Sequence, residues 1–379
     1  MDPDRSSLSE LAKIFLRLGA TSFGGPAAHI AIMEDEFVRR RHWLSHEEFL
    51  DLVSACNLIP GPNSTEMAIH LGLLRGGWPG FLVAGISFIA PAMGIVMGLG
   101  WAYHLYGSLP WALGILHGVE PVVVAVVIQA VWSLGRSALR SWSLGAVFAV
   151  CLAAALAGMD ELVILAAAGL GLILARAASD GRARLGALAL SGAAALPALS
   201  PASAKAAPTA SALFWIFLKA GACLFGSGYV LLAFLRHDLV LAHGWMTEAQ
   251  LLDATAVGQV TPGPVFTTAT FIGYTLAGPG AAVACTVAIF LPAFFFVALS
   301  APWIVKARRS KPASAFLDGV NAASLALMAG VALTLFRSVS GSIEAMALVV
   351  LSAAILLRYR LNVTWLLAGG ALLGLLGLI

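Results

Sequence analysis

Two Pro-Gly-Pro motifs break the hydrophobic sequence, one in each half of the chain. They are Pro60-Gly61-Pro62 and Pro262-Gly263-Pro264. Proline has no backbone N–H to donate, and glycine adopts backbone angles that other residues avoid. In a membrane segment such a break is tolerated only where protein or a water-filled cavity receives the freed polar groups. Two matching breaks are the sequence feature that best indicates the binding site of a transporter.

Hydrogen-bond donors follow each motif directly. Asn63, Ser64 and Thr65 open the segment after the first motif, and Thr267 and Thr268 lie just after the second. A helix that begins there presents unpaired N–H groups and the positive end of its dipole, which favour anions. An inverted pair of such helix ends near the membrane midplane would form a donor-rich cage for a small oxyanion. The alternative is that each motif is only a tight connection between two helices.

Two cations occupy equivalent positions inside apolar segments. Arg17 and Lys219 are separated by the same 202 residues that separate the two motifs. A charged residue within a membrane span is a functional candidate by default, and two related cations suit a dianion. The alternative is that each long side chain reaches out to the lipid headgroups.

Three acidic residues are candidates for proton coupling. Asp51 and Asp253 are equivalent in the two halves, and Glu66 lies just past the first break. The two aspartates could instead face water near the start of their helices. Glu66 would raise the cost of binding an anion unless it is protonated, paired or turned away.

The remaining polar and flexible residues give weaker signals. Gly24 and Gly226 would allow close backbone approach and bending, although glycine is common in membrane helices. Neither the histidines nor the four isolated cysteines have the spacing of a metal site or a disulfide framework, so we expect no metal and no cofactor. Nothing in the sequence indicates nucleic-acid binding.

Composition places the chain in a membrane. Of its 379 residues 60% are hydrophobic and only 11% are charged, with a mean hydropathy of +0.92. Soluble domains carry about 25% charged residues. The sequence therefore predicts an all-α, polytopic integral membrane protein. The first residues do not resemble a cleaved leader, so we expect the first helices to direct insertion themselves.

The chain contains an internal repeat. Pairs at the offset of 202 include Gly19/Gly221, Phe23/Phe225, Trp43/Trp245 and Gly76/Gly278, and past a one-residue gap the offset becomes 201, as in Gly118/Gly319. A chance match does not hold one register over so many distinctive residues. We predict a first repeat over 1–177, a cytoplasmic linker over 178–211 and a second repeat over 212–379.

Each repeat is predicted to contain five spanning helices and one broken pair. The first-half spans cover residues 11–30, 79–104, 112–134, 142–158 and 161–177, and the second-half spans cover 212–231, 279–304, 314–336, 343–357 and 362–379. The helices on either side of each Pro-Gly-Pro motif have about 13 residues, or roughly 20 Å, and look like half-helices of a re-entrant hairpin. Ser45 and Glu48 predict a capping box there, and residues 34–41 predict a solvated connection.

The basic residues predict that the two halves are inverted. Arg140 and Arg176 follow the third and the fifth span of the first half, whereas Arg308 follows the second span of its repeat and Arg358 the fourth. Basic loops face the cytoplasm. Equivalent loops of the two halves would then lie on opposite sides, as an odd number of spans per half requires.

The motifs resemble the chromate ion transporter family. The resemblance rests on Phe23-Gly24-Gly25-Pro26, on residues 57–66 with the sequence NLIPGPNSTE, and on FGSG and QVTPGP at 225–228 and 259–264. It covers nearly the whole chain and corresponds to the two-domain, long-chain members. It implies a prokaryotic plasma-membrane protein that exports chromate and confers resistance to it, with kinship to sulfate handling.

The expected activity is therefore secondary transport of chromate, with membrane lipid around the protein and a homodimer as a further expectation. A proton-coupled sulfate importer is the nearest alternative, followed by an anion channel. An intramembrane enzyme with Ser64 or a cysteine as nucleophile lacks a base constellation, so we expect no enzyme activity. The chain has no GxxxxGK[ST] motif for binding ATP.

Overall fold

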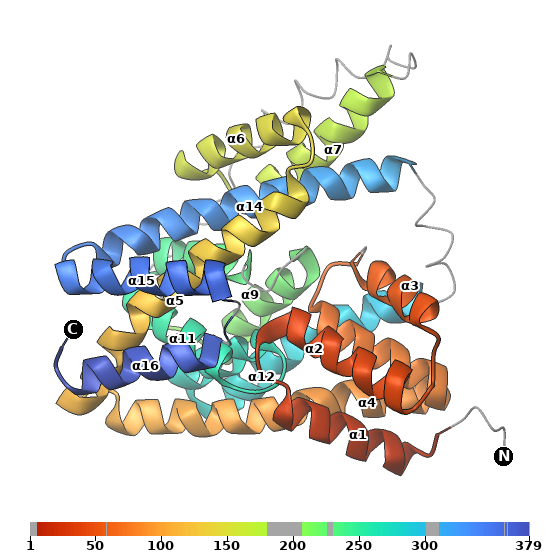
Figure 1. Cartoon of the computed structure of the whole chain (residues 1–379), viewed down its shortest axis with the longest axis horizontal. Coiled ribbons are helices and arrows are strands. Elements are labelled where there is room, and N and C mark those ends of the chain that lie inside the picture. Colours follow the sequence, from red (N-terminus) through yellow and green to blue (C-terminus); the bar gives the residue numbers. More distant parts are fainter. Residues whose placement is uncertain are drawn as a thin grey trace.

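The computed structural model describes residues 6–57, 59–179, 207–225, 230–300, 311–359, 361 and 363–378. Most of the predicted linker, residues 180–206, lies outside this part of the chain, as does Gly226. The described residues form helices and connections, with no strand among them (Figure 1). This confirms the all-α prediction.

The first half forms seven α-helices and one π-helical segment among the described residues. These are α1 (Leu8–Thr21), α2 (Gly25–Glu34), η1 (Asp35–Arg40), α3 (His46–Cys56), α4 (Asn63–Tyr106), α5 (Pro110–Ala138), α6 (Trp142–Leu156) and α7 (Glu161–Ser179). The first predicted span is wrong in one respect, because two helices replace a single one. Gly24, with φ of 102°, makes the break between them.

The second half repeats this order. Its elements are α9 (Ala210–Cys223), α10 (Leu231–Leu235), the π-helical η3 (Arg236–Ala242), α11 (Glu248–Val260), the 3₁₀ turn η4 (Val265–Thr267), α12 (Thr268–Ser300), α14 (Lys311–Val339), α15 (Ile343–Tyr359) and α16 (Val363–Leu375). Both halves cap the helix before the break with the same device. Ser45 with Glu48 and Thr247 with Gln250 form capping boxes, the first as predicted.

A sharp kink divides α4 and α12 into a short leg and a long leg. Gly77 has φ 60° and ψ −154°, and Gly278 has φ 80° and ψ −172°. These two glycines are equivalent, so the predicted pairing of Gly76 with Gly278 is wrong by one residue. The one-residue gap lies before the kink, where η4 replaces the first α-helical turn of α4. A 3₁₀ turn rises about 2.0 Å per residue against 1.5 Å, so fewer residues cover the same length.

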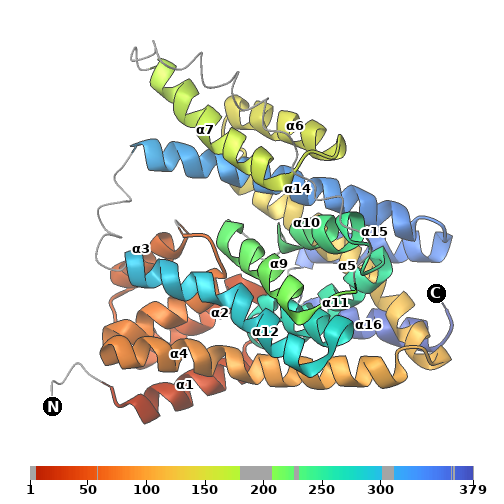
Figure 2. The ribbon, with the colours of Figure 1, turned by 180° about the vertical axis from the view of Figure 1, so that it is seen from behind.

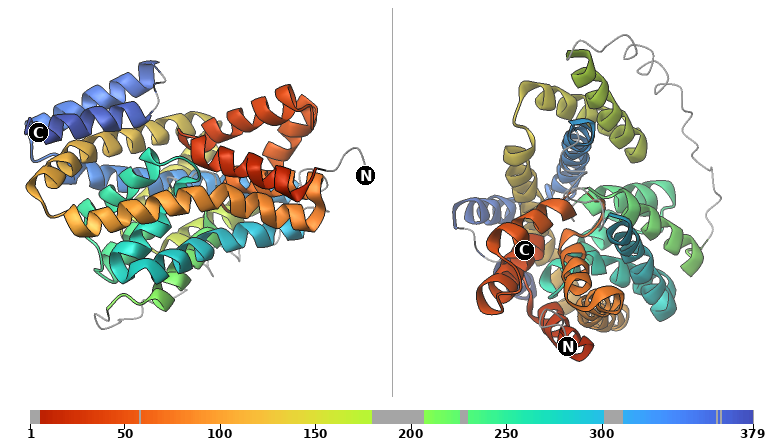
Figure 3. Two further views of the ribbon diagram at one scale, coloured as in Figure 1. Left: turned by 90° about the horizontal axis from the view of Figure 1, so that it is seen from below. Right: turned by 90° about the vertical axis from the view of Figure 1, so that its right-hand side faces the viewer.

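The long legs of α4 and α12 pack together and run in opposite directions. A side chain at Gly85, near the start of the long leg of α4, would meet Phe294, near the end of the long leg of α12, so the start of one leg lies beside the end of the other. Figures 2 and 3 show the two legs side by side. Because these legs are equivalent elements of the two repeats, their antiparallel packing shows that the halves are inverted.

The two halves also exchange helices. α5 packs against α15 and α16 of the second half, and α14 packs against α6 and α7 of the first. The backbones approach so closely at Gly118 and Gly370 that a Cβ on either would collide with the carbonyl of the other. A Cβ on Gly319 would likewise collide with the backbone carbonyl of Ala168. Each half therefore completes the other.

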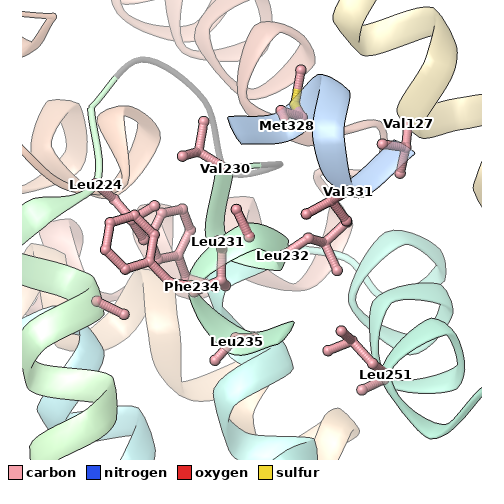
Figure 4. Close-up of a cluster of buried hydrophobic side chains, with 14 of the residues drawn as sticks. Val127, Leu224, Val230, Leu231, Leu232, Phe234, Leu235, Leu251, Met328 and Val331 are labelled. Carbon is pink, nitrogen blue, oxygen red and sulfur yellow. The ribbon is translucent and has the colours of Figure 1, made fainter. Parts of the chain in front are cut away.

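A short helix anchors the core between the halves. Every residue of α10 is buried, and its side chains lie in one cluster with Leu251 of α11, Met328 and Val331 of α14, and Leu224 at the end of α9 (Figure 4). This cluster lies next to the second-half elements that carry the site.

Four helices among the described residues are long and apolar enough to cross a membrane: α4, α5, α12 extended to Val265, and α14. Three shorter apolar helices, α6, α9 and α16, accompany them. Together with the inverted repeat, they make this a polytopic membrane protein of two related halves.

The connection after α2 is not the solvated loop that its charges predicted. It continues as η1, in which Glu36 and Phe37 are buried. The buried carboxylate is tolerated because Arg17 and Arg41 both pair with it, at 2.6 and 2.7 Å.

Candidate functional site

The first Pro-Gly-Pro motif is a buried break between α3 and α4. Pro60, Gly61 and Pro62 are all buried, and Gly61 has φ of 141°, which glycine adopts without strain. The side-chain N–H of Asn63 donates to the side-chain amide oxygen Oδ1 of Asn57 across the break. The two asparagines thus fix the end of α3 against the start of α4.

The second motif makes the same break between α11 and η4. Pro262, Gly263 and Pro264 are buried, and Gly263 has φ of 87°. A Cβ at Gly263 would lie 2.8 Å from both the Ala92 side chain and the carbonyl oxygen of Gly19. Both contacts belong to the first half, so the second break is packed into the opposite repeat.

Each break is hydrogen-bonded to the other half of the protein. The N–H of Gly61 donates to the carbonyl of Leu224 at 2.7 Å, and the N–H of Gly263 donates to the carbonyl of Ser22 at 2.8 Å. Ser22 and Leu224 are the C-caps of the equivalent helices α1 and α9. The glycine N–H that each break frees is therefore satisfied by the opposite half, and each break is tied in this way across the interface between the halves. Gly24 follows Ser22 closely in the chain.

The hydroxyl groups beside the two breaks are not equivalent. The Thr65 hydroxyl is fully buried and has no hydrogen-bond partner among the described residues. Ser64 beside it is also buried. In the second half, Thr267 and Thr268 donate to the backbone carbonyls of Pro264 and Val265. The first break holds an unused donor, whereas both of these threonines already have partners.

Glu66 lies against the first break. Its side chain is fully buried, neither carboxyl oxygen has a partner among the described residues, and one oxygen packs against Gly61. The equivalent position in the second half carries threonine. An isolated buried carboxylate is expensive, so this group must be neutral or exchange its surroundings when a ligand binds.

The two predicted cations each form an ion pair. Arg17 pairs with Glu36 of η1 at 2.6 Å, and Lys219 pairs with Asp238 of η3 at 2.6 Å. Arg41 adds a second partner to Glu36. Burial alone would raise the pKa of Glu36, but its bonds to Arg41 and Arg17 outweigh this and lower it. In this conformation the cations are directed at carboxylates and do not stand free.

Glu36 and Asp238 were missed in the sequence. They stand at the same offset of 202 as Arg17 and Lys219, so the repeat register could have found them. They were overlooked because a run of charges between two helices usually indicates a solvated loop.

The two equivalent aspartates differ in their surroundings. Asp51 on α3 is exposed. Asp253 on α11 is 5% exposed and accepts a hydrogen bond from the Tyr103 hydroxyl at 2.8 Å. Glu120 and His117 of α5 lie within electrostatic range of it. The structure thus buries one candidate proton carrier and leaves its counterpart at the surface.

One cluster of described residues has side chains that could ligate a metal. Asp160, Glu161 and His237 place their ligand atoms within 4.8 Å of one another. Asp160 already caps α7 by accepting from the N–H groups of Leu162 and Val163, and Glu161 contacts His237 at 3.1 Å. These contacts give each side chain a partner within the fold.

Inverted halves with matching broken helices are an architecture typical of transporters, and this chain has two such halves, each with a buried break. It belongs to the chromate transporter family, whose sequence model matches residues 9–173 and again residues 211–375.

Three relatives show the extent of the similarity. The "Chromate transport protein" of Cupriavidus metallidurans is 33% identical over 373 residues, 97% of this chain and 93% of the relative. The protein of the same name from Pseudomonas aeruginosa is 33% identical over 86% of this chain and 80% of its own length. A "Probable chromate transport protein" of Synechococcus elongatus is 33% identical over 87% of this chain and 85% of its own length. No solved structure matches the chain significantly.

The close approach of Gly263 to Gly19 and Ala92 allows a test of how tightly the second break packs against the first half. We expect Gly263→Ala to lower stability by about 1–3 kcal/mol more than Gly158→Ala, because only the first adds overpacking to backbone strain. Gly158 has φ of 81°, close to the 87° of Gly263, but has open space around it. Thermal unfolding of the purified protein in detergent measures the difference. Equal losses in the two variants would contradict the close packing of the second break against α1.

Proposed function

We propose that this protein is a secondary carrier that exports chromate across the plasma membrane by alternating access and so confers resistance to chromate. The observation that carries the proposal is the reciprocal pair of hydrogen bonds from Gly61 and Gly263 to the opposite halves. The names of the three relatives support the choice of substrate.

In this proposal the dianion binds between the two breaks. At the first break Thr65 would donate its unused hydroxyl, with Ser64 and Asn63 contributing from the first turn of α4. A helix N-terminus favours an anion through its N–H groups and its dipole. Thr267 and Thr268 would contribute from the second break once they give up their bonds to the backbone.

The hydrogen bonds between the halves are the contacts that would change during transport. When one half rocks against the other, the N–H groups of Gly61 and Gly263 would lose the carbonyls of Leu224 and Ser22. Buried donors do not stay unpaired, and an oxyanion between the breaks would accept from them. Substrate binding and movement of the halves would therefore be coupled.

Arg17 and Lys219 would provide the positive charge for the dianion, with Glu36 and Asp238 as counter-ions that hold them in place. Of the three acidic candidates for proton coupling, Glu66 and Asp253 are buried and suit the role better than the exposed Asp51. Glu66 is the more direct candidate because it borders the first break.

The membrane potential is sufficient to drive export. A cell interior at about −100 mV pushes a dianion outward with roughly 4.6 kcal/mol, at about 2.3 kcal/mol per charge. Efflux therefore requires no coupled ion, and proton antiport would only add a second driving force to the voltage.

Replacing the unused hydroxyl tests the binding site. Thr65→Val keeps the shape of the side chain and removes a buried hydroxyl that has no partner, so stability should be unchanged or slightly higher. Chromate counterflow in proteoliposomes should fall about tenfold or more, since a lost hydrogen bond to a charged group weakens binding by about 1.5–3 kcal/mol. Thr255→Val is the matched control, because the Thr255 hydroxyl only donates to the Leu251 carbonyl within α11. Full counterflow in Thr65→Val would remove Thr65 from the site.

Exchanging the members of one ion pair tests the role of Lys219. Lys219→Asp alone places two carboxylates together and should destabilise the protein, and the addition of Asp238→Lys should restore most of the lost thermal stability. Chromate counterflow should stay low in the exchanged pair, because the ammonium group has moved from α9 to η3. Recovery of counterflow together with stability would show that the pair is purely structural.

A further inference from the structure

A polar cavity opens beside the first break. It has a volume of about 620 Å³ and lies between the end of α3, the C-terminal end of α5, α7 and the N-terminal part of α14. We call it the arginine vestibule, after Arg140 and Arg176 in its lining. Asn57, which holds Asn63 at the start of α4, lies in the same wall. The vestibule therefore extends to the residue that fixes the start of α4 beside the first break.

Among the described lining residues, basic side chains outnumber acidic ones. Arg140 and Arg176 contribute two guanidinium groups, and Asp318 contributes the one carboxylate of the described wall, paired with Arg176 at 2.7 Å. Guanidinium groups bind oxyanions through charge-assisted hydrogen bonds, often with two at a time. Such a wall concentrates anions from the solution next to it.

The vestibule also contains an unused buried donor. Ser324 of α14 is 2% exposed, lines the cavity, and its hydroxyl has no partner among the described residues. A buried hydroxyl without a partner is costly unless a bound group or water completes it. This observation is independent of the arginines and indicates a polar occupant.

The equivalent positions in the other half have a different chemistry. With the offset of 201, Arg140 corresponds to Gly341 and Arg176 to Gly377, and Asn321 in the vestibule corresponds to Glu120. Because the halves are inverted, these equivalents lie around the opposite end of α5. There Glu120 lies within electrostatic range of the buried Asp253.

A second cavity lies at that opposite end of α5. Its volume is about 420 Å³, and its described lining includes Tyr103, Leu113 and Gln250 but no lysine or arginine. Leu113 is the equivalent of Ser314, which lines the vestibule. The two ends of the pathway thus differ in charge although the repeat that builds them is the same.

We propose that the arginine vestibule is a second binding site, which captures tetrahedral divalent oxyanions such as chromate and sulfate on one face of the protein only. It rests on the proposed function in that the captured anion is the one passed to the breaks. The described lining of the cavity at the opposite end contains no lysine or arginine to hold a dianion, which favours its release. Capture on one face changes rates, and the direction of net transport remains set by concentration and voltage.

The inference is tested without measuring transport. Cysteines are introduced at the equivalent positions by Ser314→Cys in the vestibule and by Leu113→Cys at the opposite end. Cys223 is first replaced by serine, because it is the one native cysteine that is not fully buried. Each variant, purified and reconstituted in zwitterionic lipid, is labelled with an anionic sulfonate and with a cationic trimethylammonium thiosulfonate reagent.

We expect the ratio of anionic to cationic labelling rates to be about tenfold higher at position 314 than at position 113, at the lower end of what electrostatic focusing produces. Sulfate or chromate should slow labelling at position 314 and leave position 113 unaffected. Arg140→Gln should lower the ratio at 314, and Asp318→Asn should raise it. The rise cannot result from misfolding. Arg337→Gln, which removes a positive charge at the far end of α14, is the matched control. It should leave the ratio of labelling rates unchanged at both positions.

Equal ratios at the two positions would overturn the inference, and so would labelling at position 314 that sulfate does not slow. If anionic phospholipid protects position 314 and free oxyanions do not, the arginines bind lipid headgroups and the inference fails. Because labelling needs no flux, a protein that captures sulfate but does not carry chromate would overturn the proposed function and leave the vestibule in place.

Discussion

Satisfaction of backbone polar groups away from water is the constraint on which this structure depends. A Pro-Gly-Pro break in an apolar segment frees N–H and C=O groups that lipid cannot pair. Here the glycine N–H of each break donates to the carbonyl of the residue that ends α1 or α9 in the opposite half. The two repeats must therefore fold together. The exchange of helices between α5 and α14 and the close glycine contacts at Gly118 and Gly370 reinforce the same dependence.

Within this symmetric frame the polar residues are distributed unevenly. The first break holds Glu66 and the unused hydroxyl of Thr65, whereas Thr267 and Thr268 at the second break bond to their own backbone. Asp253 is buried and its counterpart Asp51 is exposed. In the proposed alternating-access cycle, the inverted repeat would provide two related conformations, and these differences in side chains would let the two faces act differently on one substrate.

The sequence predicted the architecture because the architecture rests on local rules. The repeat register, the two breaks, the capping box at Ser45 and the inversion all follow from residue types at fixed spacing. The break at Gly24 and the position of the one-residue gap could not be predicted, because a glycine within an apolar run is equally compatible with a continuous helix. The gap depends on a 3₁₀ turn, η4, that has no distinct sequence signal.

The partners of the predicted site residues were harder to predict than the residues themselves. Arg17 and Lys219 were identified as unusual charges, but their pairing with Glu36 and Asp238 depends on two π-helical segments that the charge pattern concealed. The arginine vestibule brings together residues from α3, α5, α7 and α14, and contacts between segments so distant in sequence are set by tertiary packing alone.

The most direct test of the central claim is chromate flux in oriented proteoliposomes under an imposed voltage without a pH gradient. A carrier built from two alternating halves predicts saturable flux that follows the voltage, together with counterflow between labelled and unlabelled chromate. Electrical conductance far above carrier turnover rates, or flux that does not saturate, would contradict alternating access and show that the breaks line an open channel.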